Sequence, residues 1–156
     1  MEASDNGTAR LDLANEPQPD ALLLIDPARG GQARISDDDY VEGAPELVAE
    51  VAASSASYDL HTKLDVYRRN GVREYIVWRV GERQLDWFVL RQDHYEMLTP
   101  GPDCIIRSEV FPGLCLDVEA LLRGDLARVL AVVQQGTSSP EHTDFIRRLQ
   151  QPSSGS

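Results

Sequence analysis

The sequence contains few cysteines and no long apolar run. Its two cysteines, Cys104 and Cys115, are too few for a disulfide framework, so we expect reduced thiols in a cytoplasmic protein. The longest apolar stretches, residues 21–25 and 131–133, fall far short of the roughly 20 residues that span a bilayer. The N-terminus has no basic region followed by an apolar stretch, so no secretory signal is expected.

Basic residues are also scarce. The chain has 15 Lys and Arg against 26 Asp and Glu, which gives a net charge of −11. This balance counts against a protein that binds nucleic acid by bulk electrostatics, because phosphate contacts need basic side chains. It leaves open an enzyme that holds a metal ion in an acidic pocket, because the ion then supplies the positive charge.

The chain is long enough for one domain with a hydrophobic core, since it has 156 residues of which 42% are apolar. Both ends are polar and rich in Ser, Gly, Thr or Pro. We therefore predict a disordered tail over residues 1–8, a domain over residues 9–136 and a flexible tail over residues 137–156. Within the second tail, residues 144–151 are expected to form a short, loose helix.

The apolar pattern between the tails predicts a mixed sheet. Unbroken apolar runs at residues 21–25 and 47–52 are typical of strands that are buried on both faces. Apolar side chains with helical spacing predict a helix over residues 58–70. Further strands are predicted at residues 72–80, 84–90, 94–98 and 104–106, and a helical stretch, weakened at Gly124, at 118–135. This order indicates an α/β or α+β domain, in which the strands on either side of the first helix run parallel.

An acid inside one of these buried strands is the strongest indication of chemistry. Glu50 lies within LVAEVA, and a buried carboxylate is unfavourable unless it is paired or binds a cation. Asp20 follows Pro19 at the start of the other apolar run, and two acids on adjacent strands could hold Mg²⁺. Lys63 falls in the first two turns of the next helix, where its long side chain can reach back to orient water or neutralise a phosphate.

Structural explanations of the same residues stay open. Asp20 alone fits a turn residue after proline, and Glu50 with Lys63 fits a buried ion pair. Three arginines, Arg68, Arg69 and Arg73, form a basic patch. The patch either contacts phosphates or stabilises the C-terminus of the helix.

Three segments together resemble a known family. They are NEPQPDALLLI, VEGAPELVAEVAASSASYDLHTKLDVYRRNGVREYIVW and FPGLCLDVEALL. Over about residues 9–125 the chain is similar to the bacterial Uma-two family of restriction-endonuclease-like proteins, which belongs to the PD-(D/E)XK nuclease superfamily. The resemblance implies a mixed β-sheet core flanked by helices and a metal-dependent endonuclease that cleaves DNA.

The resemblance also assigns roles to residues. Asp20 and Glu50 match the metal-binding acids, and Mg²⁺ or Mn²⁺ is the implied cofactor. The superfamily lysine, expected two residues after Glu50, is replaced by Ala52, and in this family it lies on the following helix at Lys63. Glu46 and Gln18 are candidates for a supporting shell around the metal, with a solvated strand end as the alternative for each.

Some features depart from the family pattern. Members often carry an aspartate near the position of Arg79. This chain lacks that aspartate, so no third acid is expected there. They also have a longer region before the Pro-Asp strand, which implies that this chain is truncated or that its start is misassigned. A homodimer is expected from the way such nucleases pair. A catalytically silent relative, which keeps the fold as a binding module, is the alternative function.

Overall fold

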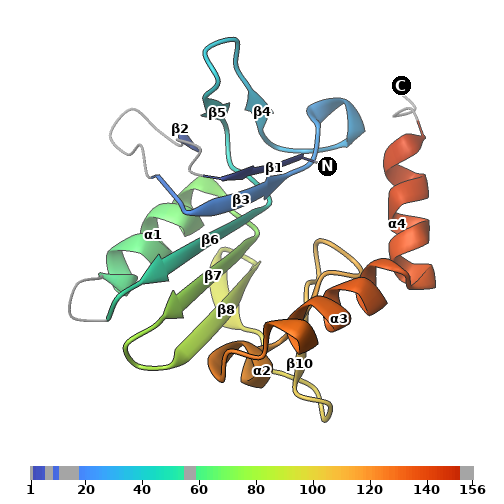
Figure 1. The fold of residues 1–156 in the computed structure, drawn as a ribbon. Helices are drawn as coiled ribbons and strands as arrows, with labels where there is room; N and C mark the ends of the chain where they lie inside the picture. Colours follow the sequence, from blue (N-terminus) through green and yellow to red (C-terminus); the bar gives the residue numbers. More distant parts are fainter. Residues whose placement is uncertain (1, 6–8, 11–17, 55–58, 152–156) are drawn as a thin grey trace.

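The computed structural model describes residues 2–5, 9–10, 18–54 and 59–151. Its centre is a six-stranded sheet in the order β1-β3-β6-β7-β8-β9 (Figure 1). Strands β6 and β7 run parallel and the other neighbours run antiparallel, so the sheet is mixed. The bounds of the six strands are β1 Glu2–Asp5, β3 Ala21–Leu24, β6 Leu47–Ala52, β7 Glu74–Arg79, β8 Gln84–Arg91 and β9 His94–Met97.

In the described part of the chain, smaller sheets and five helical elements accompany this sheet. The short strands are β2 Ala9–Arg10, β4 Arg34–Ile35, β5 Val41–Glu42, β10 Ile105–Arg107 and β11 Cys115–Asp117. The helices are η1 Pro27–Arg29, α1 Leu60–Asn70, α2 Val118–Leu122, α3 Leu126–Thr137 and α4 Pro140–Gln150. The chain has an α+β fold with a mixed sheet, which confirms the predicted fold class.

Helix α1 forms the crossover between the parallel strands β6 and β7. The Asp59 side chain accepts a hydrogen bond from the Thr62 backbone N–H at the start of the helix. Gly71 ends the helix with a φ of 80°, a conformation that glycine adopts without strain. The predicted helix agrees with α1 within the described residues, and Tyr58, its first predicted residue, lies outside them.

The two faces of the sheet bury different side chains. In β6, Val48 and Ala52 belong to the core cluster that also contains Tyr67 of α1. Leu47 lies on the other face, in the cluster that contains Trp87 and Phe145. Because alternate residues of a strand share a face, Glu50 lies on the same face as Val48 and Ala52, beneath α1.

Regular secondary structure occurs within both of the predicted tails. Residues 2–5 form β1, which pairs with β3, while residues 1 and 6–8 lie outside the described part. Residues 140–150 form α4, whose Phe145 is buried. The helix starts within the Ser-Ser-Pro sequence of residues 138–140, because Ser139 caps it and Pro140 occupies its first turn.

The predicted helical stretch of residues 118–135 is interrupted. Gly124 has a φ of 79° and separates α2 from α3. Asp117 caps α2, as its position in the sequence predicts, and Asp125 caps α3. Within the described ranges, no helix combines the length and the apolar character needed to cross a membrane.

Phe145 should make α4 part of the cooperative fold. Its ring packs edge-on against Phe111, with 6.0 Å between centroids. We expect Phe145→Ala to lower the free energy of unfolding by about 3 kcal/mol, because the substitution leaves a cavity between α4 and the core. Gln150→Ala, at an exposed position of the same helix, should change it by less than about 0.5 kcal/mol. Equal urea midpoints for the two variants would show that α4 unfolds separately.

Glu74 gives the fold a pH dependence. Its buried carboxylate accepts hydrogen bonds from the Trp87 indole, the Ser108 hydroxyl and two backbone N–H groups. Burial nevertheless raises the pKa of Glu74 above its ordinary value of 4.5. The stabilisation tied to this raised pKa is therefore complete below about pH 4.5 and decreases as pH rises through the folded-state pKa. The free energy of unfolding of wild type, measured by urea titration, should therefore decrease relative to that of Glu74→Gln as pH rises. Parallel pH profiles of the two proteins would contradict this expectation.

Candidate functional site

Glu50 lies at the centre of a converging set of hydrogen-bond donors. Its side chain is 5% exposed. Its Oε1 atom accepts hydrogen bonds from Lys63 Nζ at 3.1 Å and from the Tyr67 hydroxyl at 2.7 Å. Its Oε2 atom accepts one from the Tyr75 hydroxyl at 2.9 Å. The buried carboxylate is therefore held at both oxygens by groups from α1 and β7.

The β6–α1–β7 crossover brings these donors together. Lys63 and Tyr67 are four residues apart on α1, so both side chains lie on the helix face that covers β6. Tyr75 enters from the neighbouring strand, where it pairs with Val48 and shares the face of Glu50. The two tyrosine rings contact each other, with 4.9 Å between centroids. Their packing fixes the hydroxyl groups that orient the carboxylate.

Direct contacts compensate the charge of the Glu50 carboxylate. Transfer of a carboxylate from water into a protein interior is unfavourable unless charged or polar partners replace the lost hydration. Tyr67 and Tyr75 are fully buried, whereas the Lys63 side chain is 34% exposed. Lys63 therefore reaches from solvent to the buried acid, which places the ammonium group between the two environments.

Asp20 is connected to the same part of β6. It is exposed, immediately before β3, and its Oδ2 accepts a hydrogen bond from the Val51 backbone N–H at 2.6 Å. In the β3–β6 pair Ala21 lies opposite Ala49, so one further step of this register sets Asp20 opposite Glu50. Opposite residues of an antiparallel pair share a face. The structure thus brings all three predicted catalytic residues to one end of the sheet.

The donor chemistry at this end fits a hard divalent cation. Two carboxylates offer the oxygen ligands that Mg²⁺ prefers, and Mg²⁺ usually retains several waters in protein sites. Across the described ranges no group of three or more His, Cys, Asp or Glu side chains has a geometry suited to a metal ion. Among the described residues, Asp20 and Glu50 are the acids that would hold such a cation at this end.

The two predicted supporting residues have different surroundings. Glu46 is fully buried, and its carboxylate accepts hydrogen bonds from the backbone N–H groups of Ile25 and Gln32, both at 2.8 Å. These bonds fasten the segment after β3 to the start of β6. Gln18 is exposed, two residues before Asp20. A role for either residue around a metal ion stays a prediction.

Arg79 lies near the position at which the resemblance implies an acid. It lies opposite Ala52 of β6 and forms ion pairs with Asp86 and Glu82. Asp86 is buried within β8. The strand end next to Glu50 thus carries an arginine that is neutralised locally.

Sequence reasoning missed the hydroxyl groups around Glu50. Tyr67 falls in the helix predicted over residues 58–70 and Tyr75 in the strand predicted over residues 72–80, and neither was among the predicted site residues. The available signal was chemical, because a buried tyrosine hydroxyl usually finds a hydrogen-bond partner and a buried carboxylate needs donors.

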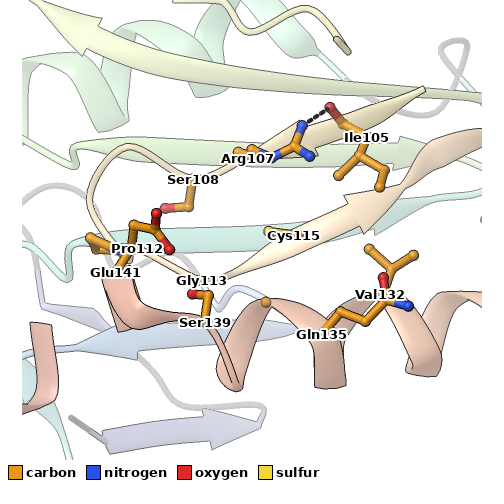
Figure 2. A pocket seen from close by; sticks show the side chains of 11 residues that line it. Ile105, Arg107, Ser108, Pro112, Gly113, Cys115, Val132, Gln135, Ser139 and Glu141 are labelled. Carbon is orange, nitrogen blue, oxygen red and sulfur yellow. Dashed lines mark hydrogen bonds between the residues drawn. The ribbon is translucent and has the colours of Figure 1, made fainter. Parts of the chain in front are cut away.

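A separate cavity of about 440 Å³ lies between the β10–β11 pair and the junction of α3 and α4 (Figure 2). Arg107 lines it but donates to the Ile105 carbonyl and to Asp103. Cys115 also lines it, and burial raises the pKa of its thiol, which makes it less reactive. None of the predicted site residues lines this cavity.

Comparison with known proteins identifies the family of the chain. A search of curated proteins found no match to the chain. A family model described as "Putative restriction endonuclease", Uma2, matches residues 2–119. The match spans well over half of the 156 residues and includes Asp20, Glu50 and Lys63. The protein therefore belongs to the Uma2 family of restriction-endonuclease-like proteins.

Proposed function

We propose that this protein is a divalent-metal-dependent endonuclease of DNA whose site is formed by Asp20, Glu50 and Lys63. The observation that carries the proposal is the contact of a lysine ammonium with a buried strand carboxylate, next to a second acid tied to the same strand. Family membership supports the nuclease chemistry. Restriction-endonuclease-like proteins generally use divalent metals, which supports a metal cofactor.

The proposed roles follow from the contacts of each residue. Asp20 and Glu50 would hold Mg²⁺ or Mn²⁺, which polarises a phosphate and lowers the pKa of bound water. Tyr67 and Tyr75 keep the Glu50 carboxylate in one orientation. Lys63 neutralises negative charge on the phosphate or positions the water.

The position of Lys63 on a helix is compatible with this role. A lysine two residues after Glu50 would share its strand face, but Ala52 stands there. Lys63 instead approaches the carboxylate from α1, and its Nζ lies 3.1 Å from Oε1. The lysine ammonium thus contacts the Glu50 carboxylate from α1 instead of from β6.

A catalytically silent nuclease fold is the second candidate function. The observation that favours it is the ion pair itself, because the Lys63 ammonium neutralises the buried Glu50 carboxylate directly. The net charge of −11 also opposes binding to DNA. A cytoplasmic location and a homodimer, which the edge strand β9 could mediate by strand pairing, belong to both candidates.

Cleavage of supercoiled plasmid in the presence of Mn²⁺ tests the catalytic assignment. We expect wild type to nick the plasmid and Lys63→Ala to be slower by about 10²–10³-fold, since the variant loses a charge that stabilises the transition state. His61→Ala, at an exposed position of the same helix, should cleave at the wild-type rate. No cleavage by wild type, with a folded protein, would favour the silent candidate.

Metal binding separates the two candidates without relying on turnover. Mn²⁺ at a concentration of about 100 times Kd should stabilise wild type by about 2.7 kcal/mol. Asp20→Asn keeps an oxygen for the Val51 N–H but removes a charge from the site, so most of this stabilisation should disappear. Asp26→Asn, at the other end of β3, is the matched control and should respond as wild type does. Equal stabilisation of both variants would exclude Asp20 as a ligand.

A further inference from the structure

Most arginines of this acidic protein are neutralised by a neighbouring acid. Within the described part of the chain, those in ion pairs are Arg34, Arg68, Arg69, Arg79, Arg91, Arg107, Arg123, Arg128 and Arg147. Arg83 has no acidic partner but donates to the Leu122 carbonyl. Three others, Arg29, Arg73 and Arg148, have neither an ion pair nor a hydrogen bond from their side chains in this part.

These three arginines line one cavity of about 340 Å³. They come from distant parts of the sequence, because Arg29 ends η1, Arg73 precedes β7 and Arg148 lies in the last turn of α4. In Figure 1, α4 and the segment that follows β3 lie on the same side of the molecule. The remaining lining is mainly apolar, with Ile25, Val110, Pro112, Phe145 and Leu149. Folding therefore gathers three cations around a hollow with apolar walls.

The charge in this cavity is unusual for a protein with a net charge of −11. The only acid in its lining is Glu109, and that carboxylate is already bonded to Arg91. Three guanidinium groups that face one hollow repel one another unless an anion lies between them. The helix dipole accounts for arginines at the ends of η1 and α4, but it does not account for Arg73, which lies outside any helix.

Guanidinium groups indicate the class of anion. Each presents donors in a planar fork that matches two oxygens of a phosphate. We propose that Arg29, Arg73 and Arg148 form a phosphate-binding site, which is distinct from the site of Asp20 and Glu50. The bound phosphate would come either from the DNA backbone or from a small phosphate. Only the first of these sources rests on the proposed nuclease function.

The two sites lie at opposite ends of the sheet. Asp20 precedes β3, whereas Ile25 of the arginine cavity follows it. Likewise Glu50 lies near the C-terminal end of β6, whereas Arg73 borders the N-terminal end of the parallel strand β7. A strand of six residues spans about 20 Å. A phosphate bound by the arginines is thus not the one proposed to be cleaved, and it serves as a second anchoring point.

Binding of a DNA duplex without divalent metal, measured over a range of salt concentrations, tests the first source. The triple variant Arg29→Gln, Arg73→Gln, Arg148→Gln should bind about tenfold or more weakly at low salt. The slope of log Kd against log salt should decrease by about one for each arginine removed. Arg83→Gln, which also removes an arginine without an acidic partner but outside the cavity, should bind as wild type does.

Titration of inorganic phosphate, followed by backbone amide NMR shifts, tests the second source. Shifts of Ile25 and Val110 that occur in wild type and disappear in the triple variant support the site even where DNA binding does not depend on it. Absence of both effects, with a folded triple variant by circular dichroism, overturns the proposal. Phosphate binding without any plasmid cleavage leaves this site standing while the nuclease proposal fails, so the two outcomes are distinguishable.

Discussion

The hydrogen bonding of one buried carboxylate organises this protein. Glu50 is placed by β6 in an apolar layer where an isolated charge would be strongly unfavourable. It is tolerated because α1 and β7 supply an ammonium and two hydroxyl groups. The parallel pairing of β6 with β7 and the position of α1 above them are both required for these contacts. Structural stability and the candidate chemistry thus depend on the same atoms.

The elements around Glu50 were predictable because their sequence signals are local. The apolar run of β6 and the stripe and caps of α1 give their bounds within two residues. The unusual acid in β6 and the lysine on the next helix could be identified in the same way. The tyrosine donors could not, since the convergence of Tyr67 and Tyr75 on one carboxylate depends on strand register and helix placement, which are properties of the folded chain.

The C-terminal region shows the opposite case. Composition predicted a flexible tail from residue 137, yet α4 buries Phe145 in the second core cluster. The driving contacts are long-range, with Phe111 in a loop more than thirty residues earlier. The segment is polar on average, so its composition does not reveal the few apolar side chains at helical spacing. These are Phe145, Ile146 and Leu149. The place of Arg148 beside other arginines could not be predicted either, because the residues around it depend on this packing.

The contact between Lys63 and Glu50 has a consequence for selectivity. The ammonium and any incoming cation are attracted to the same carboxylate, so they compete by ion exchange. Binding of the incoming ion would have to compensate the free energy of the Lys63–Glu50 ion pair. The apparent binding free energy is smaller by that amount. At equal distance from the carboxylate, a divalent ion would gain about twice the Coulomb energy of a monovalent ion. In the proposed metal site, the Lys63–Glu50 ion pair would therefore favour divalent over monovalent ions.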